Sequence, residues 1–131
     1  MKGSTMQRSL IMFGLLSWSL YAASSNAADE KAQAQTTAGK RVYDAWCVDC
    51  HGKGPGRYGR GLTGTEALEA KYEGKLPAVL DERTDLTPEL VRHFVRNGAS
   101  VMPFFRKTEI NDAELAALAS YLSRLNPELK Q

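Results

Sequence analysis

Apolar residues recur at helical spacing in several segments of the chain, and no segment shows the alternation of apolar and polar residues typical of a β-strand. The spacing predicts four helices, over residues 38–47, 65–72, 88–97 and 112–126. The pattern contains no internal repeat and no sustained heptads. It therefore predicts a small all-α domain.

The third predicted helix has clear signals at both ends. Thr87 is a good N-cap, and Pro88 occupies the first helical position, where proline is tolerated. The pair Asn97-Gly98 follows the last periodic position, and both residue types accept the positive φ that ends a helix. We therefore expect this helix to be well defined.

The second predicted helix has weaker signals, and the fourth is the clearest helix of the chain. Thr65 is a possible N-cap of the second helix, and Gly74 is a possible stop. Asn111 caps the fourth helix, Glu114 completes a capping box, and Pro127 terminates it.

Three segments lack a helical period. Residues 28–37 are polar and predict a flexible N-terminal arm. Residues 52–61 form a glycine-rich loop that lacks the Gly-Lys-Ser/Thr of a phosphate-binding loop, so we expect backbone that wraps closely around a flat, rigid group. Residues 75–85 predict a connecting loop.

The N-terminus has the composition of a secretory signal peptide. Lys2 and Arg8 precede an apolar run over residues 10–23, and Ser25-Asn26-Ala27 places small residues at the cleavage positions. An uncleaved anchor is the alternative, but the run is shorter than the roughly 20 residues of a membrane-spanning helix. The predicted organisation is a signal peptide over 1–27, the arm over 28–37 and one domain over 38–126, in a periplasmic protein.

Cleavage would change the charge balance of the chain. Loss of Lys2 and Arg8 from the 17 basic residues leaves as many basic residues as there are acidic ones, which number 15. A neutral chain argues against a nucleic acid or a membrane surface as the partner. Cleavage also leaves Met102 as the remaining methionine.

The pentapeptide from Cys47 to His51 is the attachment signature of c-type haem, C-x-x-C-H. Two thiols at this spacing can each add to one vinyl group of the porphyrin, and the histidine then becomes the proximal iron ligand. A predicted export signal and a predicted helix leading into Cys47 support this hypothesis. We therefore expect one covalent haem bound through Cys47 and Cys50.

Met102 is the predicted distal iron ligand. It lies in a loop, where Pro103 excludes a helix and where Phe104 and Phe105 can keep water from the thioether. His93 is the competing ligand, but it falls within an amphipathic helix, where a lone histidine is more often a surface residue. Iron held by His51 and Met102 has no open position and is suited to electron transfer.

Two other sites share some of these residues. Trp46-Cys47-Val48-Asp49-Cys50 contains the W-C-x-x-C of thioredoxin-like proteins, but that motif belongs in a βαβ context. Zinc could take Cys47, Cys50, His51 and His93, but a second C-x-x-C is missing. A haem enzyme or sensor with an open iron position would require Met102 to be absent from the iron or displaceable.

The chain resembles the class I c-type cytochromes from Gly39 to Leu125. Gly39, Tyr43 and Cys47 resemble the N-terminal helix of that family, and Leu118 and Tyr121 resemble the C-terminal helix that crosses it at the glycine. The family usually has Gly-Pro-x-Leu-x-Gly after the haem motif, where this chain has Gly-Arg-Gly-Leu-Thr-Gly over residues 59–64. The resemblance implies that a backbone carbonyl orients the proximal histidine, and Pro55 is the substitute for the missing proline.

A narrower resemblance covers Arg83 to Gly98 and Met102-Pro103. These residues are similar to the cytochrome subunits of flavocytochrome 4-alkylphenol hydroxylases of the p-cresol methylhydroxylase and eugenol hydroxylase types. The resemblance implies a non-catalytic subunit that accepts electrons one at a time from a flavoprotein and passes them to a downstream redox protein. A free-standing cytochrome that serves another dehydrogenase or oxidase is the alternative.

Overall fold

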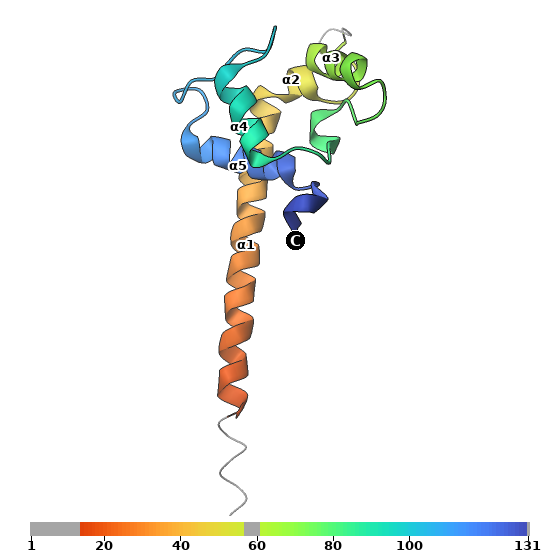
Figure 1. Ribbon diagram of the computed structural model, residues 1–131. Coiled ribbons are helices and arrows are strands. Elements are labelled where there is room, and N and C mark those ends of the chain that lie inside the picture. The colour runs from red at the N-terminus through yellow and green to blue at the C-terminus, as the bar shows by residue number, and fades with distance from the viewer. Residues whose placement is uncertain (1–13, 57–60, 131) are drawn as a thin grey trace, which may run out of the picture. The chain divides into compact units, whose positions relative to one another are not determined.

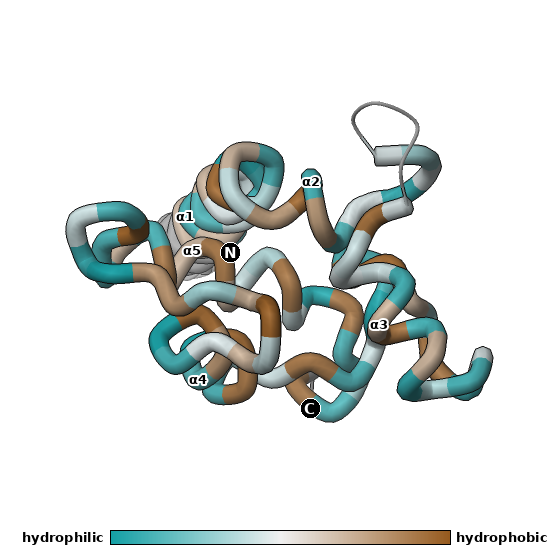
Figure 2. Tube along the Cα trace, turned by 90° about the horizontal axis from the view of Figure 1, so that it is seen from above, coloured by the Kyte–Doolittle hydropathy of each residue, from teal (hydrophilic) through white to brown (hydrophobic). Residues whose placement is uncertain are grey.

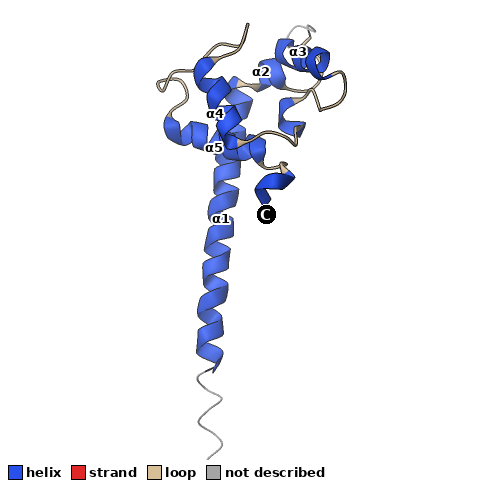
Figure 3. Cartoon of the chain, viewed as in Figure 1, coloured by secondary structure: helices blue, strands red, loops and turns tan. Residues whose placement is uncertain are grey.

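The computed structural model describes residues 14–56 and 61–130, and their regular structure is helical (Figure 3). Within these residues, Ala99 and Met102 also form an isolated antiparallel β-bridge. The predicted all-α class is confirmed. The helices are α1 Gly14–Trp46, α2 Val48–His51, α3 Thr63–Tyr72, the 3-10 helix η2 Leu80–Glu82, α4 Pro88–Asn97, α5 Asp112–Ser123 and the 3-10 helix η3 Pro127–Lys130.

Contacts divide the chain into two units, residues 1–33 and 34–131. The described part of the first unit is the N-terminal portion of α1, and residues 27–34 of this helix are exposed. Residues 28–37 are therefore helical, which differs from the irregular arm that their polar composition predicts. The segment contains alanine, glutamine, lysine and glutamate but no glycine or proline, so nothing in it breaks a helix.

The N-terminal apolar segment lies partly outside the described residues, which begin at Gly14. No helix in the described ranges is both long enough and apolar enough to cross a membrane.

The second unit is organised around the crossing of α1 and α5 (Figure 1). At Gly39, a Cβ would collide with the carbonyl oxygen of Ala117, so the two backbones meet here without a side chain between them. One turn further on, the rings of Tyr43 and Tyr121 lie 5.7 Å apart. The predicted helix crossing at the glycine is confirmed.

The core of this unit lies between α5 and its neighbours α1 and α4. Figure 2 shows apolar residues alternating with polar ones along α4, as expected for a helix with one buried face. Ile110 and Leu118 are the largest fully buried side chains. The other buried apolar side chains of this cluster are those of Tyr43, Cys47, Leu86, Val91, Val95, Leu115, Ala119, Tyr121 and Leu122.

The predicted ends of α4 and the start of α5 are confirmed. The Thr87 side chain accepts a hydrogen bond from the Leu90 amide at 3.2 Å. The Asn111 side chain accepts from the Glu114 amide at 2.9 Å, and the Glu114 carboxylate accepts from the Asn111 amide at 2.8 Å, which completes the capping box.

Two helix ends differ from the sequence-based expectation. Thr65 is not the cap of α3, which begins at Thr63, because the Thr65 hydroxyl is bonded to carbonyl oxygens of the haem-motif turn instead. The end of α5 lies at Ser123, before Pro127, because Asn126 uses its amide nitrogen to bind the Leu86 carbonyl at 3.0 Å. The proline therefore starts η3 and does not itself terminate α5.

The predicted connecting loop over 75–85 contains η2 and ends in an ion pair between the buried Arg83 and the more exposed Asp85. Arg83 is 2% exposed and donates two hydrogen bonds to the Asp85 carboxylate, at 2.7 and 2.6 Å. The same guanidinium lies over the Tyr72 ring, 4.3 Å from its centroid. These contacts fasten the end of the loop to the end of α3.

Candidate haem site

The two cysteines and the histidine of the motif lie on a single helical turn that continues directly from α1. The Cys47 amide donates to the Tyr43 carbonyl at 2.9 Å, and the His51 amide donates to the Cys47 carbonyl at 2.8 Å. Cys47 is buried, Cys50 is exposed, and both thiols are free. The helix that leads into Cys47, predicted from the sequence, ends at Trp46 and presents the motif on α2.

The Cys47 thiol has the properties of a structural or attachment cysteine. Burial raises its pKa to about 12, so the sulfur is protonated at neutral pH. Cysteines that exchange disulfides have a lowered pKa, because the thiolate is their reactive form. Together with the helical surroundings, this argues against a thioredoxin-like site.

The His51 imidazole is held by packing and is neutral. Burial lowers its pKa, and a neutral ring is the form that binds iron or another metal. Its Nδ1 atom is buried and has no hydrogen-bond partner among the described residues. The predicted hydrogen bond from His51 to the Pro55 carbonyl is therefore not formed. Gly59 and Arg60, where the family usually has the Gly-Pro pair, lie outside the described residues.

Gly64 makes the close approach of α3 to the imidazole possible. A Cβ at this position would lie 2.5 Å from Cε1 and 2.6 Å from Nδ1 of His51, and 2.7 Å from the Cys50 carbonyl oxygen. Residue 64 must therefore lack a side chain if the ring is to keep its place. The neighbouring Thr65 hydroxyl donates to the Gly52 carbonyl at 2.9 Å, which ties α3 to the end of α2.

The backbone of His51 is fixed by a side chain from α1. The Tyr43 hydroxyl donates to the carbonyl of His51, eight residues later in the chain, at 3.0 Å. Tyr43 is 2% exposed, and burial raises its pKa, so the hydroxyl remains protonated and available as a donor. The proximal segment is thus braced from both α1 and α3.

Met102 lies in the loop between α4 and α5. Its amide donates to the Ala99 carbonyl at 2.9 Å, and the Ala99 amide donates to the Met102 carbonyl at 3.1 Å. The side chain of Met102 is half-buried. The next residues include Phe104, which is 61% exposed, and Phe105, which is half-buried with its ring edge toward Trp46.

These residues fit a covalent haem. The described part of the chain offers two free thiols on one turn, a neutral, half-buried imidazole and a thioether in a fixed loop. Several large apolar side chains of α1, α4 and the Met102 loop are exposed, as expected for surfaces that a flat apolar group covers. They belong to Trp46, Leu90, Phe94, Val101 and Phe104.

The alternative metal site finds no support in the described residues. His93 is exposed on α4, and its ring contacts Phe94 and the Asn97 amide. Within the same residues, no group of three or more histidine, cysteine or acidic side chains is arranged to bind a metal ion. A zinc site that combines His93 with the motif is therefore not formed.

Sequence reasoning missed three supporting residues. The motif pattern predicts the thiols, the imidazole and the thioether, but it does not identify the Tyr43 hydroxyl as a donor to His51 or Gly64 as the residue against the ring. It also does not identify Arg96, whose Nη1 donates to the Phe105 carbonyl at 3.0 Å in the loop that follows Met102. The one available signal was the glycine at the end of the Gly-x-Gly-Leu-x-Gly sequence over residues 59–64.

Comparison with known proteins agrees with this chemistry. The family described as cytochrome C oxidase, cbb3-type, subunit III matches residues 34–122. The 4-cresol dehydrogenase [hydroxylating] cytochrome c subunit of Pseudomonas putida is 30% identical over 128 residues, which cover 94% of this chain and 88% of that protein. No solved structure matches the chain. The chain therefore belongs to the haem-binding cytochrome c family, and its function is electron transfer.

Proposed function

We propose that this chain is an exported monohaem cytochrome that accepts electrons from a partner flavoprotein dehydrogenase acting on 4-alkylphenols. The partner is inferred from the similar cytochrome subunit of 4-cresol dehydrogenase and from the sequence around Arg83–Gly98. A downstream redox protein would be the acceptor. The export signal is inferred from residues 1–27.

Cys47 and Cys50 would hold the haem through thioether bonds, each formed when an S–H adds across one vinyl group. His51 and Met102 would bind the iron from opposite sides. The haem, when bound, supplies a one-electron redox centre with no open coordination position. The single observation that carries this proposal is the turn from Cys47 through α2, which places two free thiols and a neutral, half-buried imidazole within five residues.

The remaining task of the protein is to hold these ligands still and to keep water away from them. Tyr43 fixes the His51 backbone, and the buried surroundings keep the imidazole unprotonated. Three residues after Met102, the half-buried Phe105 packs against the core cluster and the Trp46 ring. An environment with little water favours the less charged, reduced form of the iron site.

The cofactor is tested on the protein purified from the periplasmic fraction. We expect haem staining that survives a denaturing gel, and we expect Cys47→Ala or Cys50→Ala to reduce the stained protein severely. Met102→Ala should retain the stain but lose the long-wavelength band of a methionine–ferric haem bond and lower the reduction potential. His93→Ala is the matched control and should keep the band. A colourless wild-type protein, or a band that survives Met102→Ala, would refute the corresponding assignment.

The partner and the export signal are tested separately. We expect the mature protein to begin near Ala28 and to co-purify with a flavoprotein that reduces it on addition of a 4-alkylphenol. Because the mature chain is neutral and Phe104 is exposed, partner affinity should depend little on salt. Phe105 and Tyr58 are further candidates for this apolar contact, but Tyr58 lies outside the described residues. A steep salt dependence would contradict an apolar contact surface.

A further inference from the structure

The loop that carries Met102 is held at two points, and one of them is the tight turn at residues 98–102. Two hydrogen bonds close this turn between Ala99 and Met102. Gly98 has a φ of 70°, and a Cβ there would lie 2.6 Å from the Met102 carbonyl oxygen. The turn therefore fixes Met102 relative to the end of α4.

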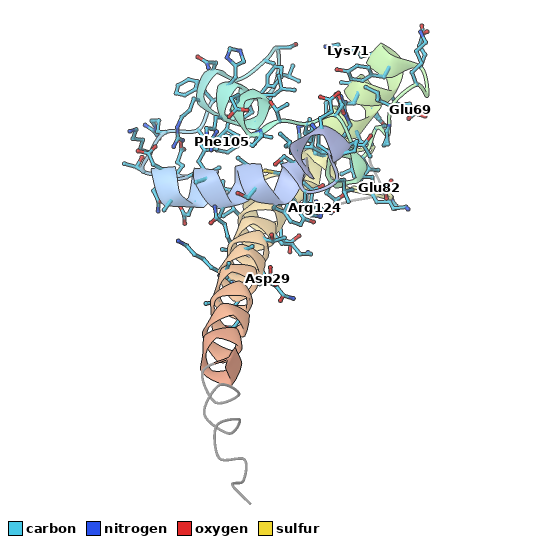
Figure 4. The ribbon with its side chains drawn as sticks, turned by 60° about the horizontal axis from the view of Figure 1, so that its bottom comes forward. Asp29, Glu69, Lys71, Glu82, Phe105 and Arg124 are labelled. Carbon is cyan, nitrogen blue, oxygen red and sulfur yellow. The ribbon has the colours of Figure 1, made fainter. Side chains whose placement is uncertain are left out.

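The second point is Phe105, which lies beside α4 and α5 (Figure 4). Its amide donates to the Val95 carbonyl at 2.7 Å. Its carbonyl accepts a hydrogen bond from Nη1 of Arg96 at 3.0 Å. Both backbone polar groups of Phe105, three residues after Met102, are thus bound to the last turn of α4.

The Arg96 guanidinium joins this loop to the next helix. Its Nη2 donates to Oδ1 of Asp112, the first residue of α5, at 3.0 Å. The other oxygen of Asp112 is 2.7 Å from Nζ of Lys107. Arg96 is 23% exposed, so its bonds are better shielded from water than those of the more exposed Arg92–Glu89 pair on the same helix. One side chain therefore bridges α4, the loop and α5.

We propose that Arg96 is a positioning residue that holds the Met102 thioether in place for axial ligation. The inference rests on the proposed ligation of iron by Met102. A planar guanidinium can direct two donors to two fixed acceptors, and lysine cannot reproduce this geometry. Without the bond to Phe105, the loop is held by fewer contacts, and the thioether leaves its position more often.

The test uses the haem-loaded, full mature protein and measures how fast imidazole replaces the methionine on ferric iron at neutral pH. We expect Arg96→Gln to raise this rate about tenfold, since it removes a hydrogen bond from a charged donor. Arg96→Lys should give an intermediate rate. Covalent haem per polypeptide should stay at the wild-type level in each variant.

Arg92→Gln is the matched control, because Arg92 lies one turn earlier on α4 in an exposed pair with Glu89. We expect this variant to exchange within about twofold of the wild-type rate, as for other exposed pairs. If Arg96→Gln does not accumulate, Asp112→Asn tests the same bridge from the other end, with Lys107→Gln as its control. Asp112→Asn should exchange faster than Lys107→Gln, and equal rates in these two variants would overturn the proposal.

Met102→Ala separates the two proposals. If Met102→Ala binds imidazole much faster than wild type while Arg96→Gln matches wild type, Arg96 has no positioning role and the ligand assignment stands. If Met102→Ala and wild type have the same spectrum and the same rate, Met102 is not a ligand and the proposed iron site is wrong.

Discussion

The two sides of the candidate haem site are built in different ways. On the proximal side, Cys47, Cys50 and His51 lie on one helical turn, whose backbone hydrogen bonds connect near neighbours in the sequence. On the distal side, Met102 lies in an irregular loop that is held by groups from α4 and α5. The proposed proximal ligand, His51, therefore lies on a local helical turn that α1 and α3 brace, whereas the proposed distal ligand, Met102, depends on contacts between helices for its position.

This difference predicts that substitutions on the two sides will impair different properties of the protein. A change on the proximal side should alter haem attachment and overall stability, because the turn is continuous with α1 and packs against α3. A change on the distal side should leave the covalent haem attached and alter ligation by Met102. The following substitutions test this distinction, beginning with the largest expected effect.

Gly64→Ala should be the most damaging single change on the proximal side. The new methyl group would lie 2.5 Å from His51 and 2.7 Å from the Cys50 carbonyl, so α3 or the turn must move. We expect the free energy of unfolding to fall by about 3 kcal/mol, at the upper end of the range for overpacked sites, and holoprotein yield to fall with it. Urea titration and haem staining measure both quantities.

Ala67→Gly, at an exposed site on the same helix, is the control and should lower stability by only about 1 kcal/mol. Equal losses of stability in the two variants would show that the contact between residue 64 and His51 is unimportant.

Gly98→Ala should be the corresponding change on the distal side. Its φ of 70° with ψ of 179° is accessible almost only to glycine, and the new methyl group would meet the Met102 carbonyl. We expect a loss of about 2 kcal/mol in stability, retained covalent haem and a weakened methionine–iron band. Gly54→Ala is the control, because Gly54 also has a positive φ but has nothing within 4 Å of a new Cβ. A band as strong in Gly98→Ala as in Gly54→Ala would contradict the distal role of this turn.

Acid should weaken the distal side through Asp112, and this is the smallest of the three effects. Hydrogen bonds from Lys107 and Arg96 lower the pKa of Asp112 below its ordinary value, so its contribution to stability is complete above about pH 4 and is lost as the pH falls through the lowered value. We expect part of the methionine–iron band to fade in this range at low salt. The fading should be smaller at high salt, because Asp112 is exposed. Asp112→Asn should have the weaker band at neutral pH and lack this component of the titration; an unchanged titration would remove Asp112 from the distal support.

The sequence predicted the parts of the fold that local chemistry determines. Thr87, Pro88 and Gly98 bound α4 as expected, and Asn111 with Glu114 caps α5 as expected. The errors occur where distant groups compete for the same atoms. Thr65 bonds to the Gly52 carbonyl and so does not cap α3, and Asn126 binds the Leu86 carbonyl at a point where continued helix was expected.

The same limit applies to the site. The spacing of Cys47, Cys50 and His51 is a local signal, and the surroundings of Met102 are unusual enough to identify it as a candidate ligand. The supports of these ligands carry no such signal. From the sequence, Tyr43 is expected to be an ordinary core aromatic residue and Arg96 an ordinary surface cation. Their bonds to the His51 and Phe105 carbonyls depend on the tertiary fold.

The direct backbone contact of Gly39 with Ala117 has a consequence for the order of events during biosynthesis. The helix that leads into Cys47 cannot pack against α5 until nearly eighty residues beyond Gly39 have been synthesised. Because the Cys47 thiol is buried in the finished fold, the proposed attachment of haem to it would have to precede complete folding. The proposed maturation would therefore depend on the relative rates of attachment and folding.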